Sequence, residues 1–369
     1  MPSLIYLQPM HGYPTAQVHS IQITRTVGAL GRHVDVLLVA GSLSVEPEKL
    51  PGAVRDYYNV EFGPQVRVIT MPGTRLQGLS FPFALREIMA SASEGAAFYT
   101  RSYLMARRLL RYRWMHKRKV FFESHKKMGY WNKEPLEGSP YADARQRFAE
   151  RNEPIAQIRR VYQQADCVFF LHKHSLALAR RDLALRDAEH LWYGLRCSTR
   201  AAPTGGQGIV YAGSLSEDKL IDFLLDALDR VETDVRVSVY GGDSDQIGDL
   251  RRRVAARPCG KRLDFRGWQR PADLSRELPK YRFGVAMQEG MKVVDYLESG
   301  LTPIVSDTPA YRDVFDARHA CFFRPDSPEQ LAQALDHAVD HAIQPAAIRQ
   351  LCDTYSVERR ARKILARLE

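Results

Sequence analysis

FGVAMQEGMKVVDYLESGLTPIVS, residues 283–306, is the stretch of sequence that decides the fold class. It opens with an apolar run at Phe283–Met287 that is typical of a buried strand. A polar turn containing glycine leads into an amphipathic helix at Met291–Ser299, and a second apolar run follows at Pro303–Ser306. A strand, a helix and a strand joined by short turns predict two parallel neighbours in a sheet.

The same alternation of strand and helix extends through the whole chain. Further strands are predicted at 4–7, 34–39, 96–100, 120–123, 167–171, 209–212, 235–240 and 263–266. The stretch STRAAPTGGQ at 198–207 has the small residues, proline and glycine that are typical of a linker. Because 369 residues are too many for one ordinary core, we expect an α/β protein of two doubly wound domains, at 1–200 and 201–345.

Composition narrows the protein class. No apolar run approaches the roughly 20 residues of a membrane helix, and the first residues look like a strand rather than a signal peptide. The five cysteines are far apart in sequence and form no CxxC pair; they are Cys167, Cys197, Cys259, Cys321 and Cys352. We therefore expect reduced thiols in a cytoplasmic protein, without a disulfide or a zinc site. A net charge of +10 predicts an anionic partner.

Glycine-containing turns follow four of the predicted strands in the second half. Since the carboxyl ends of parallel strands meet at one edge of a sheet, these turns should form a ligand-binding rim; they are Gly213-Ser214, Gly241-Gly242-Asp243, Gly267-Trp268 and Gln288-Glu289-Gly290. Beyond the last turn, the free amides at Gly290 and Met291 and the charge of Lys292 suit a diphosphate. Asp295 can accept hydrogen bonds from ribose hydroxyls. The alternative is an ordinary Lys292–Asp295 ion pair on an exposed helix.

The sequence of these segments resembles a known family. K-x-x-D-Y-L-x-S-G-x-x-P-I-V-S, from Lys292 to Ser306, resembles a segment of the family-4 glycosyltransferases, which have the GT-B fold of two facing Rossmann-like domains. Tyr211–Leu228, VSVYGGD and LDFRGWQ are similar to further segments of that family, in the same order. In the first half the similar stretches are YTRS at 99–102 and FFESH at 121–125. The last helix is similar to one that returns to the first domain, so we expect 346–369 to do so.

The resemblance implies a role for several residues. Lys219 matches the lysine that contacts the donor diphosphate, and Asp295 matches an acidic residue that binds ribose. Gly267 and Trp268 fall where the nucleotide base is bound. Two positions depart from the pattern, since Ser214 replaces an arginine and Met287 replaces a glutamate. Glu289, two residues further on, is the candidate for the acid that contacts the sugar.

Residues of the first domain are candidates for contacts with the acceptor and with the donor sugar. Arg101 and His125 each follow a predicted strand, so both should lie at the ligand-bearing edge. The resemblance gives His125 a place near the donor sugar, and an arginine can hold a phosphate. The alternative is that each caps a local carbonyl. Gly12 and Tyr13 lie in the first strand–helix loop, where backbone amides can meet a ligand, unless Gly12 only serves the turn.

The stretch from Tyr103 to Lys119 carries seven basic residues and no acid. Met105, Leu109 and Tyr112 keep helical spacing and predict a buried face, which leaves the cations outward. We expect Arg107, Arg108, Arg111 and Arg118 to rest on anionic lipid headgroups, with Trp114 as an interfacial anchor. The alternative is a solvated basic face that only keeps the protein soluble.

These observations predict a glycosyltransferase that moves a sugar from a nucleoside diphosphate donor to a hydroxyl acceptor. We expect no metal and no cofactor, because lysines and helix amides supply the positive charge; retention of configuration is implied by the resemblance alone. The expected acceptor is a lipid-linked or cell-surface glycan precursor of polysaccharide biosynthesis, met at the inner face of the membrane. A soluble acceptor is the alternative. QPMHGYPTA lacks the GxGxxG of a nicotinamide oxidoreductase, and no nucleic-acid-binding motif occurs.

Overall fold

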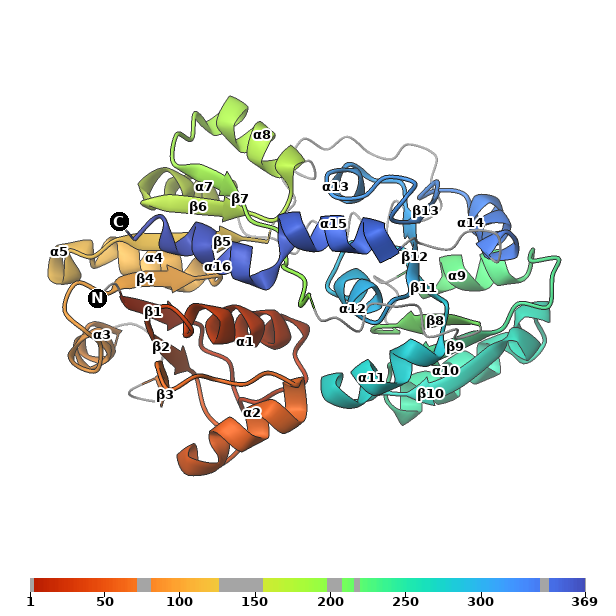
Figure 1. Cartoon of the computed structure of the whole chain (residues 1–369), viewed down its shortest axis with the longest axis horizontal. Helices are drawn as coiled ribbons and strands as arrows, with labels where there is room; N and C mark the ends of the chain where they lie inside the picture. The colour runs from red at the N-terminus through yellow and green to blue at the C-terminus, as the bar shows by residue number, and fades with distance from the viewer. Residues whose placement is uncertain are drawn as a thin grey trace. The chain divides into compact units, whose positions relative to one another are not determined.

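The computed structural model describes residues 3–71, 81–125, 155–197, 208–215, 220–338 and 345–368. These residues form two compact units (Figure 1). The first unit contains the described residues up to 125, those from 155 to 194, and those from 357 onward. The second unit contains the described residues from 195 to 356. The linker predicted at 198–207 lies outside the described residues.

The first unit is built on a seven-stranded parallel sheet with the order β3-β2-β1-β4-β5-β6-β7. Its strands are β1 (Ser3–Leu7), β2 (Asp35–Ala40), β3 (Val66–Thr70), β4 (Ala97–Thr100), β5 (Val120–Ser124), β6 (Cys167–Phe170) and β7 (Ala188–His190). Its α-helices are α1 (Val18–Leu30), α2 (Leu50–Tyr58), α3 (Phe81–Ala90), α4 (Tyr103–Arg111), α5 (Arg113–His116), α7 (Ile155–Gln164), α8 (Lys173–Leu183) and α16 (Val357–Leu365).

Helices cover both faces of this sheet. Ile5 and Leu7 of β1 share one hydrophobic core with α3 and α4. Because side chains alternate along a strand, Leu4 and Tyr6 face the opposite layer, where α1 packs against α16. Every residue of β1 is therefore buried, which explains its continuous apolar run.

The second unit is built on a six-stranded parallel sheet with the order β10-β9-β8-β11-β12-β13. Its strands are β8 (Ile209–Ala212), β9 (Val237–Tyr240), β10 (Leu263–Gly267), β11 (Phe283–Ala286), β12 (Thr302–Ser306) and β13 (Cys321–Phe323). Its α-helices are α9 (Ile221–Leu228), α10 (Ser244–Val254), α11 (Pro271–Glu277), α12 (Lys292–Glu298), α13 (Pro309–Arg312), α14 (Pro328–Asp336) and α15 (Pro345–Tyr355).

The stretch at 283–306 forms β11, α12 and β12, and the two strands pair in parallel as predicted. Gly284 lets the helix pack closely on its strand, since a Cβ there would lie only 2.4 Å from the ring of Tyr296. The Tyr296 hydroxyl in turn donates to the Val285 carbonyl and accepts from the Ala212 amide. The prediction of two doubly wound parallel sheets is confirmed.

The C-terminal segment consists of two helices that belong to different units. α15 lies in the second unit and α16 in the first. The basic stretch with helical spacing forms two helices, since α4 ends at Arg111 and α5 begins at Arg113. Within the described part of the chain, no helix is long and apolar enough to span a membrane.

The expectation that all five cysteines are reduced was wrong, because Cys197 and Cys352 form a disulfide. The two cysteines are 155 residues apart in sequence, so their spacing gives no sign of it. The fold brings their segments together, since the Leu195 amide donates to the Tyr355 carbonyl at 2.8 Å and Leu195 pairs with Ser356 in an isolated bridge. Of the other three, Cys167 and Cys259 are buried thiols and Cys321 is half-buried.

Candidate functional site

Three of the predicted glycine turns in the second unit are joined by backbone hydrogen bonds. The Gly213 amide, after β8, donates to the Tyr240 carbonyl at the end of β9 at 2.9 Å. The Gly241 amide, after β9, donates to the Gly267 carbonyl at the end of β10 at 3.0 Å. The carboxyl ends of β8, β9 and β10 therefore form one continuous rim of backbone, which contains three of the four predicted turns.

Glycine is required at this rim because the turns approach each other closely. Gly241 has φ +136°, and a Cβ there would lie 1.8 Å from the Gly213 carbonyl oxygen. Gly242 has φ +73°, and its Cβ would lie 2.5 Å from the Leu215 side chain. Any side chain at either position would push the turns apart. Trp268 follows Gly267 at the third turn and is 49% exposed.

Lys292 brings a positive charge to this rim. It is the first residue of α12, and its ammonium lies 4.3 Å from the centroid of the Tyr211 ring. A Cβ at Gly213 would lie 2.9 Å from the same Nζ, so the glycine makes room for the ammonium at the end of β8. The aromatic face stabilises the charge, and the Tyr211 hydroxyl donates to the carbonyl of Ser214.

The turn after β11 is held by the beginning of α13. Thr308 Oγ1 donates to Glu289 Oε1 at 2.7 Å, and the Tyr311 hydroxyl donates to the Gln288 carbonyl at 2.7 Å. Glu289 is therefore oriented by a threonine that sequence reasoning did not select. A Cβ at Gly290 would meet no atom within 4 Å, so open space lies beside this turn.

The remaining predicted donor residues differ in position. The Met291 side chain is buried, so only its backbone can face a ligand. Asp295 lies half-buried one turn along α12, and its amide donates to the Met291 carbonyl. Ser214 is exposed. Lys219 lies outside the described residues.

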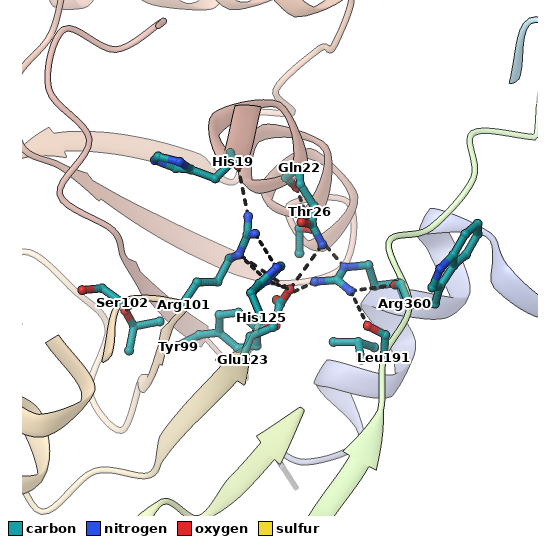
Figure 2. Close-up of polar contacts among 12 residues, drawn as sticks. His19, Gln22, Thr26, Tyr99, Arg101, Ser102, Glu123, His125, Leu191 and Arg360 are labelled. Atoms are coloured by element: carbon teal, nitrogen blue, oxygen red, sulfur yellow. Dashed lines mark hydrogen bonds and ion pairs between the residues drawn. The ribbon is translucent and has the colours of Figure 1, made fainter. Parts of the chain in front are cut away.

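A buried polar cluster occupies the carboxyl end of β4 and β5 in the first unit, with Glu123 at its centre (Figure 2). Glu123 Oε2 accepts from Arg360 Nη2 at 2.5 Å and from the Tyr99 hydroxyl. Oε1 accepts from Gln22 Nε2 at 3.2 Å and from His125 Nε2 at 2.6 Å. Burial alone would raise the pKa of Glu123, but Arg360, His125 and Arg101 hold it well below its usual value.

Arg360 is the residue of this cluster that sequence reasoning missed. It comes from α16 and is 3% exposed. Its guanidinium donates to the Leu191 and Trp192 carbonyls, to Thr26 Oγ1 and to Glu123, so residues distant in sequence accept from all three of its nitrogens. A signal existed in the sequence, because Arg360 interrupts the apolar face that Val357, Ala361 and Ile364 form on the helix.

His125 is held in one tautomer by its neighbours. Arg101 Nη2 lies 2.9 Å from Nδ1, and because a guanidinium only donates, Nδ1 accepts there. The ring proton is therefore on Nε2, which donates to Glu123. Arg101 Nε also lies 2.6 Å from Nε2, which cannot accept in this tautomer. Burial and the charge of Arg101 lower the pKa of His125 to about 4, so the ring is neutral near pH 7.

The cluster keeps a net charge of +1, from two guanidinium groups and one carboxylate. Arg101 is fixed in it by a third contact, from Nη1 to the His19 carbonyl at 3.0 Å. The predicted edge residues Arg101 and His125 are thus brought together, as Figure 2 shows. The His125 side chain is 26% exposed, so part of it is accessible to a ligand.

The Gly12–Tyr13 loop uses its backbone amides internally. The Gly12 amide donates to Ser42 Oγ and the Tyr13 amide to the Ser42 carbonyl, both at 2.9 Å. The Tyr13 side chain is buried in the core, with its hydroxyl 2.8 Å from Thr24 Oγ1. Gly12 has φ +64°, so glycine serves the turn here.

The basic residues of α4 and of the segment after it differ in exposure. Arg107 and Arg111 are exposed, and Trp114 is 72% exposed. Arg108 is half-buried over the Phe81 ring, at 5.6 Å from its centroid. Arg118 is half-buried, with Nη1 3.4 Å from the Ala96 carbonyl.

Comparisons with known proteins agree with this fold. Residues 206–341 match the family described as "Glycosyl transferases group 1". No curated protein matches the sequence. Among solved structures, HepE of Anabaena in complex with UDP is 13% identical, with a TM-score of 0.69 over 100% of this chain and 99% of that chain. Sucrose-phosphate synthase of Thermosynechococcus elongatus is 15% identical, with a TM-score of 0.75 over 99% of this chain and 97% of that one.

The chain is a glycosyltransferase with the GT-B fold. The lipopolysaccharide outer core galactosyltransferase WaaB is a further structural match, at 11% identity and a TM-score of 0.69 over 100% of this chain and 99% of that chain. At such low identities the likeness to solved structures shows the fold alone. The family match lies within the second unit and contains the glycine rim and Lys292 of this glycosyltransferase.

Proposed function

We propose that this glycosyltransferase takes its sugar from a nucleoside diphosphate donor bound at the glycine rim of the second unit. The observation that carries the proposal is the ammonium of Lys292 at the Gly213 turn, beside strand ends where no side chain fits. Bare backbone lets a diphosphate approach closely, and the lysine supplies the charge that binds it. A UDP complex of the HepE structure supports a nucleotide donor.

Other rim residues complete the proposed donor site. Asp295, half-buried on α12, accepts hydrogen bonds from the ribose, and Gly267 with the exposed Trp268 borders the base. Lys219 adds a second cation to the diphosphate and compensates for Ser214, which stands where the resembling family has an arginine. Glu289, oriented by Thr308, contacts the sugar.

In the proposed reaction the lysines stabilise the charge that develops on the leaving diphosphate, without a metal or cofactor. The neutral His125 acts as a hydrogen-bond partner of the transferred sugar and not as a general base, because a pKa of about 4 makes it a weak base near pH 7. Retention of anomeric configuration is proposed from the family resemblance.

The proposed acceptor is a lipid-linked or cell-surface glycan precursor at the inner face of the membrane. The support is the basic, exposed surface formed by Arg107, Arg111 and Trp114, together with the match to the lipopolysaccharide galactosyltransferase WaaB. A soluble acceptor is the second candidate, and the match to sucrose-phosphate synthase favours it.

A donor screen on the Lys292→Ala variant tests the proposed site. Thermal shift and hydrolysis are measured with UDP-, GDP- and dTDP-sugars, and with NAD and DNA as competing ligand classes. We expect one nucleotide sugar to stabilise the wild type, and Lys292→Ala to weaken that binding by about tenfold or more, since a charged hydrogen bond is lost.

Lys261→Ala, which removes an exposed lysine from the second unit, is the matched control and should bind as the wild type does. Stabilisation by NAD or DNA alone, or unchanged affinity in Lys292→Ala, would contradict the proposed donor site.

A further inference from the structure

The amino edge of the first unit's sheet contains a cavity that the proposed donor and acceptor sites do not use. Its volume is about 210 Å³, and its lining includes Ser3, Ala97, Lys119 and Leu368. Ser3 begins β1, Ala97 begins β4 and Lys119 immediately precedes β5, and these three strands are neighbours in the sheet. Arg101 and His125 follow the carboxyl ends of β4 and β5, so the cavity lies at the opposite edge of the sheet.

Three consecutive cations line this cavity, namely Lys117, Arg118 and Lys119. Among the described residues that line it, none is acidic. Burial lowers the pKa of Arg118, and the charge of Glu94 offsets only part of that effect. Lys119 Nζ donates to the Arg367 and Leu368 carbonyls at 3.1 and 2.9 Å, which fixes one ammonium at the cavity. The local excess of positive charge favours an anionic ligand.

Lys117 occupies a backbone conformation that usually belongs to glycine. It is the C-cap of α5 with φ +50°, and its amide donates to the Arg113 carbonyl at 2.8 Å. A left-handed C-cap is most often glycine, because a Cβ is disfavoured there. A lysine with this backbone conformation destabilises the fold relative to glycine, but it places a cation on the cavity wall.

Ser3 provides a second, independent sign of a ligand. It is 6% exposed, and its hydroxyl has no hydrogen-bond partner among the described residues. A buried hydroxyl without a partner destabilises a folded protein, and rotation of the Ser3 side chain toward the cavity would let it donate to a ligand oxygen. A hydroxyl donor beside three cations is a set of groups that suits a phosphate.

We propose that this cavity is a phosphate-binding site, formed by Lys117, Arg118, Lys119 and Ser3. The phosphate is either free or carried by a lipid headgroup, since the same groups recognise both. The site does not rest on the proposed donor site, because it lies in the first unit and the glycine rim lies in the second.

The first test is titration of the full chain with inorganic phosphate at constant ionic strength, followed by thermal shift and calorimetry. We expect saturable binding that Lys117→Gln/Arg118→Gln weakens by about tenfold or more. The matched control is Arg107→Gln/Arg111→Gln, which removes the same charge from exposed residues of α4 that do not line the cavity, and it should bind phosphate as the wild type does.

Ser3→Ala gives a signature that a merely structural serine would not. Without phosphate the variant should unfold at a slightly higher temperature, because an unpartnered buried hydroxyl has been removed. With phosphate its stabilisation should be smaller than that of the wild type. A lower unfolding temperature with an unchanged phosphate effect would overturn the role of Ser3.

Vesicles distinguish the two sources of phosphate. Co-sedimentation is measured with vesicles containing phosphatidic acid, whose headgroup is a phosphate monoester, and with neutral phosphatidylcholine vesicles. Competition of inorganic phosphate with the phosphatidic acid vesicles would assign the site to a lipid headgroup, and binding of inorganic phosphate alone would assign it to free phosphate. If Lys117→Gln/Arg118→Gln weakens the binding of neither probe relative to the wild type, the proposal is overturned. Donor binding and hydrolysis are measured on the same variants and should not change.

Discussion

Glu123 shows how single residues organise the first unit. Its carboxylate is fully buried and holds Arg360, Tyr99, Gln22 and His125 at once. A buried charge is tolerated only where opposite charges and hydrogen bonds compensate for lost hydration. The sequence could place Glu123 and His125 at a strand end, but Arg360 lies 237 residues beyond Glu123, so their pairing could not be predicted from spacing.

We expect Glu123→Gln to lower the free energy of unfolding by about 3–5 kcal/mol, because it leaves the buried Arg360 without its carboxylate. Arg360→Met should cost a similar amount, because it removes the buried guanidinium that pairs with Glu123. The double variant should cost clearly less than the sum, since no buried charge of the pair remains. Denaturant unfolding of the wild type, the two single variants and the double variant gives this double-mutant cycle. Strict additivity would show that the two side chains do not interact.

The protonation of His125 predicts a pH dependence of stability. Its pKa is lowered from 6.5 to about 4 in the folded protein. Between these values the unfolded chain binds a proton that the folded chain does not, so stability should fall as the pH falls from 6.5 to 4. The contribution is up to about 3 kcal/mol.

His125→Gln should reduce this slope between pH 4 and pH 6.5 and leave the pH dependence above pH 7 unchanged. The lowered pKa values of His19, His116 and His319 act in the same direction, so part of the slope will remain. His33→Gln, at an exposed histidine, is the control. Unfolding curves collected from pH 4 to pH 8 test this, and an unchanged slope in His125→Gln would contradict the assigned protonation state.

At the scale of elements, the sequence predicted what depends on local pattern. β1, β2, β8 and β11 were found because continuous apolar runs indicate strands covered on both faces. β3, β7 and β13 were not predicted; β7 and β13 have three residues each, and β3 is partly exposed. The glycine rim was predicted from turn positions. The contact of Lys292 with Tyr211 could not be predicted, because it depends on how α12 packs against β8.

The disulfide joins two elements that are distant in sequence. Cys352 lies on α15 and Cys197 lies just after the first unit's last strand, in a segment that already pairs with Tyr355 and Ser356. We expect Cys352→Ser to lower the free energy of unfolding by about 2–4 kcal/mol under oxidising conditions. Denaturant unfolding with and without a reductant measures this.

The reductant supplies the control for this prediction. With the thiols reduced, Cys352→Ser and the wild type should differ little. Cys321→Ser, at a half-buried cysteine outside the disulfide, should be insensitive to the reductant. A wild type whose stability does not change on reduction would show that the disulfide does not form in solution.

At the scale of the whole molecule, the fold class was predicted from the repeated alternation of strand and helix. The function class was predicted from the order of several motifs, each of which is weak alone. The net charge of +10 is a property of the whole chain, and no sequence motif shows where on the surface the excess charge lies. The structure separates the predicted basic surface into exposed residues, Arg107 and Arg111, and half-buried ones, Arg108 and Arg118. The exposed pair and Trp114 are therefore the residues on which the membrane proposal depends.

We expect Arg107→Gln/Arg111→Gln to weaken binding to anionic vesicles by about 2 kcal/mol, because each basic residue near such a surface contributes about 1 kcal/mol. That corresponds to roughly thirtyfold in the partition constant, and it should shrink as salt screens the charges. Trp114→Ala should also weaken binding, but independently of salt, because the indole buries apolar surface between the headgroups.

The two dependences on salt separate adhesion by charge from insertion of the tryptophan. Lys261→Gln/Arg349→Gln removes the same net charge from exposed residues of the second unit and is the matched control. If it weakens vesicle binding as much as the α4 variant does, the membrane responds to net charge and not to this surface. If no variant changes binding, or if the wild type does not bind, the acceptor is met in solution and the exposed cations of α4 only keep the protein soluble.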